Sequence, residues 1–161
     1  MLFKLLRQRQ WITFNEEIRK RPPLSDIDKS ILFNTACAKP GIECSCVAAL
    51  IEAGFFVCLP NEKDTPAYHL IREGRLDILP LLIQHRPDLL KFLDEDGNTL
   101  LHYASANGNL HVAEFILNHF SKEQINARNV AGKSALDNVG SNKQMRELIS
   151  KYQGKCNKCK K

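Results

Sequence analysis

This chain of 161 residues lacks the sequence patterns of the common enzyme classes and of membrane-spanning proteins. No stretch approaches the roughly 20 consecutive apolar residues that cross a bilayer as a helix. The sequence has no HExxH zinc pair, no phosphate-binding loop of the Walker type and no Gly-x-Ser-x-Gly nucleophile elbow. Lys4, Arg7 and Arg9 interrupt any N-terminal apolar core of the length that a secretion signal requires. We therefore expect a cytoplasmic protein that is not an enzyme and holds no cofactor.

A repeat with a period of 34 or 35 residues is the main feature that the sequence does have. When Thr65 is aligned with Thr99 and Ser134, Gly74 comes into register with Gly108. A fixed period of this size is typical of stacked supersecondary units, none of which can bury its apolar face alone. The period predicts an elongated solenoid, a class of protein that binds more often than it catalyses.

The clearest unit begins at Asp94, which together with Gly97 predicts a turn, because glycine tolerates a positive φ and aspartate bonds to nearby backbone amides. Thr99 follows at the position of a helix N-cap, and a short helix is expected to end at the Asn107–Gly108 pair. Apolar residues at helical spacing then predict a second, longer helix, and they are Leu110, Val112, Phe115, Ile116 and Leu117. The unit reads turn, helix, turn, helix.

Residues 99–104, TLLHYA, resemble the Thr-Pro-Leu-His-x-Ala motif of the ankyrin repeat. One unit upstream, Thr65 and Pro66 restate the motif, with Tyr68 in place of its histidine. Tetratricopeptide repeats share the period, but their Trp, Leu-Gly and Tyr positions are missing here. Residues 25–152 are therefore interpreted as about four ankyrin-like repeats. The resemblance implies an all-α helix–turn–helix solenoid with short hairpin-like turns between repeats, and it makes the motif histidine a structural hydrogen-bonding residue rather than a base.

Apolar residues extend the pattern to the other units. A degenerate first copy has about three extra residues at 39–44, and its core is expected to contain Leu32, Phe33, Ala36, Val47, Leu50 and Ile51. The second helix of the next unit is predicted from Leu76, Ile78, Leu81, Leu82 and Ile83. The last unit is contracted by two residues, and its second helix is predicted from Met145, Leu148 and Ile149. A short, polar last unit is what a C-terminal cap requires.

The two ends are assigned separately. Residues 1–24 are interpreted as an N-terminal helical cap: an apolar stretch over 2–6, then a second helix opened by a capping box of Thr13 and Glu16. Residues 153–161 are predicted to be a disordered, basic, cysteine-containing tail.

Six cysteines require an explanation, and they are Cys37, Cys44, Cys46, Cys58, Cys156 and Cys159. We expect Cys37 and Cys58 to be buried and reduced, because ankyrin-like units hold together by apolar packing. The Cys44–Cys46 and Cys156–Cys159 pairs would each supply half of a tetrahedral thiolate site. The tail contains no further ligands to complete such a site, so no metal is predicted.

Charge is distributed unevenly around a net value of +5. Residues 1–22 carry six basic and two acidic side chains, and residues 143–161 carry seven and one, so the ends sum to +10 and the middle to −5. Basic ends around an acidic middle argue against one continuous nucleic-acid groove.

Partners of ankyrin-like proteins lie against the concave face, which the hairpin turns and the first helix of each unit form. The resemblance implies that this face is made by the positions that packing leaves free, which are Asn61, Glu62, Asp64, Arg72, Glu73, Glu95, Asp96, Asn98, Ala106, Asn107, Val130 and Lys133. Five carboxylates against two basic residues make the face acidic. We therefore expect a monomer that binds another protein through a basic segment; the alternative is that the acidic tips only keep the solenoid soluble.

Two other readings stay open at this point. The segment Leu2–Leu6, with Trp11 and the basic residues beside it, has the composition of an interfacial membrane helix, and basic ends would favour membrane contact. The divergent first repeats would also fit an effector that a bacterium sends into a host cell, where the host cytoplasm would be its location.

Overall fold

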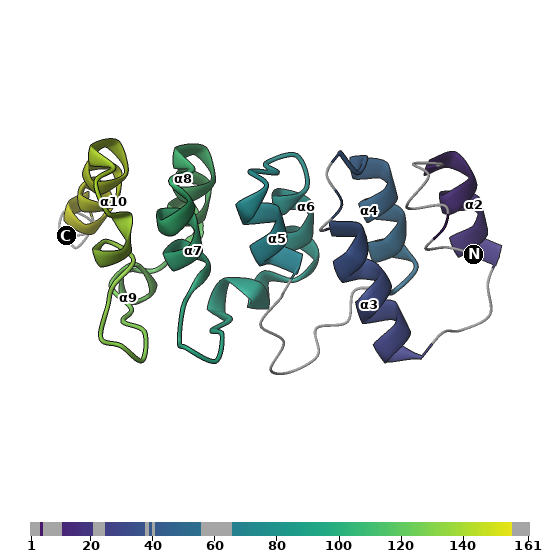
Figure 1. Ribbon diagram of the computed structural model, residues 1–161, viewed down its shortest axis with the longest axis horizontal. Coiled ribbons are helices and arrows are strands. Elements are labelled where there is room, and N and C mark those ends of the chain that lie inside the picture. Colours follow the sequence, from purple (N-terminus) through teal and green to yellow (C-terminus); the bar gives the residue numbers. More distant parts are fainter. Residues whose placement is uncertain are drawn as a thin grey trace, which may run out of the picture.

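The computed structural model describes residues 4, 11–20, 25–37, 39, 41–55 and 66–155. Its helices stack side by side in chain order into an elongated body, from α2 (Trp11–Lys20) at one end to α10 (Lys143–Lys155) at the other (Figure 1). The described elements are helices joined by turns, with one isolated β-bridge between Arg128 and Ser134. The predicted all-α solenoid is confirmed.

Three helix pairs form the middle of the solenoid. They are α3 (Asp26–Cys37) with α4 (Cys44–Glu52), α5 (Pro66–Arg72) with α6 (Leu79–His85), and α7 (Leu100–Asn107) with α8 (Leu110–His119). Short elements follow the second and third pairs, and they are η1 (Pro87–Lys91) and α9 (Lys122–Ile125). Two turns then project from the lower edge in Figure 1: hairpin 3 (residues 94–98) and hairpin 4 (residues 129–133).

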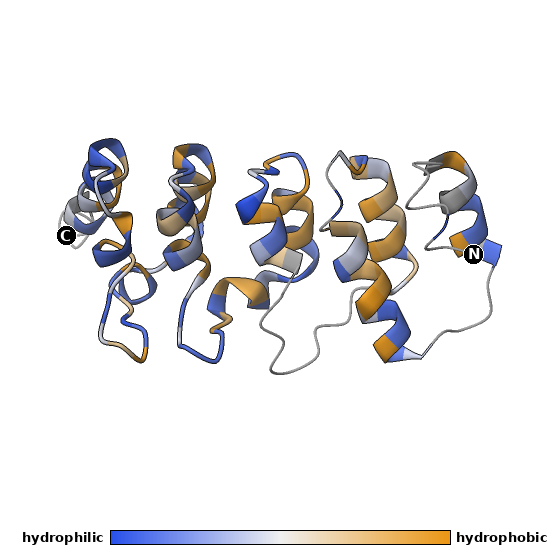
Figure 2. Ribbon diagram, in the orientation of Figure 1, coloured by the Kyte–Doolittle hydropathy of each residue, from blue (hydrophilic) through white to orange (hydrophobic). Residues whose placement is uncertain are grey.

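The core lies between neighbouring helices, and it contains the apolar residues that the repeat pattern selects. Leu32, Phe33, Leu50, Leu101 and Ile116 are each at most 2% exposed. Figure 2 shows orange hydrophobic segments on the helices of the middle pairs, while α10 is largely blue. Burial of one such side chain stabilises the fold by about 1.5 to 3 kcal/mol, so the stacked units hold together through apolar contact.

Asparagine and glycine set the junction between the two helices of a unit. Gly108 ends α7 with φ 70°, the left-handed conformation that glycine adopts without strain, and the Asn109 side chain then accepts from the Val112 amide (3.2 Å) at the start of α8. The Asn109 amide also lies against the preceding unit, because a Cβ atom at Gly74 would come within 2.6 Å of Asn109 Nδ2. A side chain at position 74 would be strained by the φ of 68° and would also displace the Asn109 amide group.

Two predicted helix starts are wrong. The second helix of the second unit begins at Leu79 rather than Leu76, and the preceding residues form a turn. Pro80 has no amide hydrogen to donate to the carbonyl of Leu76. Proline is tolerated in the first turn of a helix, so α6 begins just before Pro80 and does not include Leu76. The capping box at Thr13 is also absent, because Thr13 is the third residue of α2 and its backbone is already helical.

Helices α2 and α10 lie at the two ends of the described solenoid. α2 packs against α4 and buries Ile18, which is 4% exposed, as a cap would. The apolar stretch over 2–6 lies outside the described residues except for Lys4. At the other end, α10 continues to Lys155, three residues past the expected boundary at 152, and residues 156–161 lie outside the described part.

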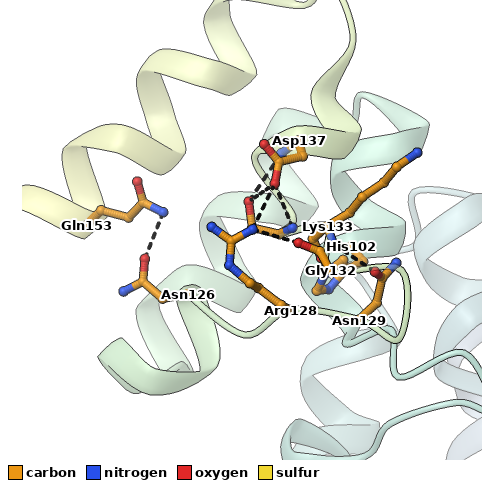
Figure 3. A network of polar contacts seen from close by, with 9 residues as sticks. His102, Asn126, Arg128, Asn129, Gly132, Lys133, Asp137 and Gln153 are labelled. Carbon is orange, nitrogen blue, oxygen red and sulfur yellow. Dashed lines mark hydrogen bonds and ion pairs between the residues drawn. The ribbon is translucent and has the colours of Figure 1, made fainter.

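The last unit has a first helix reduced to the single turn η2 (Asp137–Val139). Figure 3 shows how polar contacts support it: Arg128 Nη1 donates to the Gly132 carbonyl (2.6 Å) and lies 3.6 Å from Asp137 Oδ2. Gln153 on α10 donates to the Asn126 side chain at 3.0 Å. Met145 and Ile149 are fully buried beneath a polar outer surface on α10, which supports the interpretation of this unit as a cap.

Candidate functional site

Hairpin 3 is held rigid by the Asp94 carboxylate. Its oxygens accept from the Asn98 amide (2.7 Å), the Asn98 side chain (3.0 Å) and the Tyr103 hydroxyl (2.5 Å). Burial raises the pKa of Asp94, but the hydrogen bonds from Tyr103 and Asn98 together outweigh it, so the pKa lies below its ordinary value. The turn leaves Glu95 and Asp96 exposed at its tip.

Hairpin 4 repeats this construction with Asn129 in place of Asp94. The Asn129 side chain accepts from the Lys133 amide at 2.9 Å, and its Nδ2 group donates to Asn98 Oδ1 at 2.9 Å. The Val130 amide donates to the carbonyl of Asp96 at 2.8 Å. Two hydrogen bonds therefore fix the hairpins relative to each other.

His102 connects the third unit to the fourth. Its Nδ1 atom accepts from the Thr99 amide (3.2 Å) and hydroxyl (2.8 Å) at the start of α7. The hydrogen is therefore on Nε2, which donates to the Lys133 carbonyl at 3.0 Å (Figure 3). His102 is 2% exposed, and both of its ring nitrogens are engaged. The implied structural role of the motif histidine is confirmed.

Tyr68 has the same role one unit earlier. Its hydroxyl donates to the Asn98 carbonyl at 3.3 Å, and its ring stacks on Tyr103 with the centroids 3.9 Å apart. Burial, followed by the charge of Asp94, raises the pKa of Tyr68 far above its ordinary value, so this hydroxyl keeps its hydrogen. Replacement of the motif histidine therefore preserves the link between the hairpins and the preceding helix.

Two adjoining hollows lie where hairpins 3 and 4 meet the first helices. One, of about 140 Å³, is lined by Asn98, His102, Tyr103, Ala106 and Asn138. The other, of about 450 Å³, is lined by Asp96, Asn98, Asn129, Val130, Ala131, Lys133 and Asn138. Asn98 and Asn138 belong to both, so the two hollows form one concave site.

The structure brings together five of the residues that the resemblance assigned to a partner-binding face: Asp96, Asn98, Ala106, Val130 and Lys133. Glu95 lies at the same hairpin tip, and Asn107 is exposed at the end of α7. Arg72 and Glu73 lie apart at the end of α5, where their side chains pair at 3.3 Å. Asn61, Glu62 and Asp64 lie outside the described residues.

Sequence reasoning missed several lining residues of the concave site: His102, Tyr103, Asn129, Ala131 and Asn138. The repeat itself contained a signal for one of them. An offset of 35 residues leads from Asp96, which the resemblance assigned to the face, to Ala131.

The described part of the face is less acidic than the sequence suggested. It contains three of the five carboxylates, which are Glu73, Glu95 and Asp96, and both basic residues, Arg72 and Lys133. The formal charge of this part is therefore −1. Asp96 on hairpin 3 and Lys133 on hairpin 4 both line the larger hollow, and Glu95 is exposed beside Asp96.

The cysteines of the described part do not form a ligand set. Cys37 and Cys46 are buried, and desolvation raises the pKa of the Cys37 thiol to about 12. Cys44 is half-buried and donates to the Asp77 carbonyl at 3.5 Å. Within the described ranges, no three His, Cys, Asp or Glu side chains gather to hold a metal ion, and no helix is long and apolar enough to cross a membrane. Cys58, Cys156 and Cys159 lie outside these ranges.

Comparison with known proteins identifies the repeat. A family model described as ankyrin repeats in three copies matches residues 32–129, more than half of the chain. The chain belongs to the ankyrin repeat family. An ankyrin repeat-containing protein of Schizosaccharomyces pombe is 42% identical over 52 residues, a segment that spans 32% of this chain and 36% of the yeast protein. The chain therefore covers about a third of that relative. Ankyrin repeats are general protein–protein interaction modules, and the family is not catalytic.

Proposed function

We propose that this ankyrin-repeat chain binds a partner protein in the concave site between hairpins 3 and 4, through a segment of the partner that carries basic side chains. The observation that carries the proposal is the meeting of the two hollows beside the exposed carboxylates of Glu95 and Asp96. Five of the residues assigned to binding by resemblance line the hollows, and none of these five contributes to the buried core.

Rigidity of the hairpins supports this proposal. The bonds from Asn98 and Tyr103 to Asp94 fix hairpin 3 before any partner arrives, so little conformational entropy is lost on binding. Carboxylates at a fixed tip can form charge-assisted hydrogen bonds with lysine or arginine and can steer a basic segment toward the site.

Binding fits the site better than catalysis does. His102 is the histidine that lines the hollows, and both of its ring nitrogens are committed to Thr99 and Lys133. A general base needs a free lone pair within reach of the substrate, and the Nδ1 lone pair is already occupied.

The test is an affinity capture from cell lysate with three versions of the chain: the wild type, a Glu95→Lys and Asp96→Lys double variant, and a Glu114→Lys and Glu147→Lys double variant. Both variants change the net charge equally, but Glu114 and Glu147 are exposed on the second helices α8 and α10. We expect a captured partner to be lost with the hairpin variant and retained with the control. Circular dichroism should show equal folding of all three.

The opposite results are also informative. A partner retained equally by all three versions would contradict the proposal. If the hairpin variant only became less soluble, the acidic tips would serve solubility rather than recognition.

A further inference from the structure

The larger hollow contains one unpaired charge of each sign. Asp96 projects from hairpin 3 and Lys133 from hairpin 4, and both side chains are exposed. Neither has a hydrogen bond or ion pair from its charged group to any part of the chain that the structure describes. The bond from the Val130 amide to the Asp96 carbonyl holds the two hairpins together, so the two charges stand on a fixed frame.

The lining of the concave site contains one side-chain amide that is not committed to another described residue. Asn98 donates to Asp94 and accepts from Asn129, so both of these asparagine side chains are held in place. Asn138 is half-buried, lines both hollows, and makes no side-chain hydrogen bond to another described residue. A carboxamide offers a donor and an acceptor side by side, the complement of a main-chain peptide group.

An apolar contact lies beside these polar groups. Val130 is 81% exposed at the tip of hairpin 4 and lines the same hollow as Asp96. A partner segment that reaches Asp96 therefore also passes over an aliphatic side chain.

We propose that the concave site recognises an extended segment of a partner protein that carries one basic and one acidic side chain within a few residues of each other. The basic group pairs with Asp96, the acidic group pairs with Lys133, and the Asn138 amide bonds to the main chain between them. This inference rests on the proposed function and narrows it. A segment with basic residues alone would satisfy Asp96 but would place a like charge near Lys133, and complementary pairing on both hairpins rejects such partners.

A displayed library of random short peptides, selected on the full chain, tests the inference. The wild type should enrich peptides that contain both signs of charge in close succession. Asp96→Asn should remove the preference for the basic residue, and Lys133→Met should remove the preference for the acidic one. Each change should weaken binding of a selected peptide roughly two- to fivefold, the range of one exposed ion pair. Asn138→Ala should weaken all selected peptides, whatever their charges.

A charge exchange provides the sharpest control. The Asp96→Lys and Lys133→Asp double variant keeps the net charge and should enrich peptides in which the order of the two charges along the chain is reversed. Glu114→Gln on α8 should leave the selection unchanged, and thermal unfolding should show that every variant folds.

Three results would overturn the inference. Enrichment of purely basic peptides whose binding is unchanged by Lys133→Met would overturn the inference and leave the proposed function intact. Peptides that bind equally well to the Asp96→Asn, Lys133→Met and Glu95→Lys, Asp96→Lys variants would overturn both. Failure to enrich any peptide would also count against it, because the site is proposed to recognise a linear segment.

Discussion

Hairpins 3 and 4 have the same backbone but opposite charge. In both, the glycine amide donates back to the first residue, at 2.9 Å in Gly97 and 2.8 Å in Gly132, and both glycines have φ 73°. The first side chain accepts from the last amide in both, at 2.7 Å for Asp94 and 2.9 Å for Asn129. The remaining positions differ: hairpin 3 has Glu95 and Asp96 where hairpin 4 has Val130 and Ala131.

The difference separates two kinds of residue. An Asx side chain and a glycine are sufficient to build the turn, so those positions are constrained by the backbone. The exposed positions between them do not supply these shared turn contacts, so their side chains can differ from one hairpin to the next. The proposed function assigns partner specificity to these differing positions.

Truncation of the buried leucine that follows hairpin 3 should have the largest effect on the free energy of unfolding. Leu101 is fully buried, whereas Leu136, at the same position one unit later, is only half-buried. We expect Leu101→Ala to lower the free energy of unfolding by about 2 to 5 kcal/mol, because the lost side chain leaves a cavity between units. Leu136→Ala should cost less. Denaturant unfolding measures both, and a loss below about 1 kcal/mol for Leu101→Ala would mean that the repeat register is wrong.

Loss of a hydrogen bond between units should have the next largest effect on the free energy of unfolding. His102→Leu removes the cap on Thr99 and the bond to the Lys133 carbonyl, and we expect it to lower the free energy of unfolding by about 1 to 3 kcal/mol. Tyr68→Phe removes one longer bond to Asn98 and keeps the stacked ring, so about 0.5 to 1.5 kcal/mol is expected. Equal losses in chemical denaturation would contradict the idea that the histidine holds its unit by two separate contacts.

A matched pair of glycine substitutions tests the shared backbone directly. Gly97→Ala and Gly132→Ala both place a Cβ atom on a left-handed residue, which costs about 1 to 2 kcal/mol. At Gly97 the new atom would also lie 3.3 Å from the Val130 amide nitrogen, while nothing lies within 4 Å at Gly132. We therefore expect Gly97→Ala to lower the midpoint of thermal unfolding more. The reverse order would show that the hairpins are not held together as described.

The smallest effect concerns the charge of Asp94. Because its pKa is lowered in the folded state, the stability that it contributes is present above the unfolded pKa of about 3.9 and is lost as the pH falls through the lower, folded value. Asp94→Asn gives hairpin 3 the residue that hairpin 4 already has. The wild type should be slightly more stable at neutral pH, and the difference should shrink below about pH 4. Thermal melts over this range check it; a difference independent of pH would mean that the charge has no part in the Tyr103 bond.

Much of the fold could be predicted because the apolar period and the glycines repeat in register. Thr99, Gly108 and the buried leucines lie where the pattern placed them. The two wrong helix starts have local causes. Pro80 lies in the first turn of α6, which therefore begins later than predicted. Thr13 has the sequence pattern of an N-cap, but α2 already begins at Trp11. A capping pattern specifies possible bonds, and only the packed chain decides which of them form.

The concave site was harder to predict than the fold. The ankyrin resemblance assigned Asp96, Asn98, Val130 and Lys133 to the face, but it did not assign Asn138. Asn138 lies in the single turn η2 and lines both hollows. Its importance depends on which neighbouring amides are already bonded, which a single sequence does not reveal.

The Tyr68 and His102 contacts give the solenoid a direction. Each donor reaches toward the next unit, and the carbonyl that it meets already accepts a bond within its own hairpin, from Asp94 or Asn129. At the same position of the last unit, Asp137 turns back to Ser134 instead and caps its own turn. Truncation from the two ends is therefore not equivalent. Deletion of the last unit removes the carbonyl that accepts from His102, whereas deletion of units before Asp94 leaves the Asn98 and Lys133 carbonyls still paired within their hairpins.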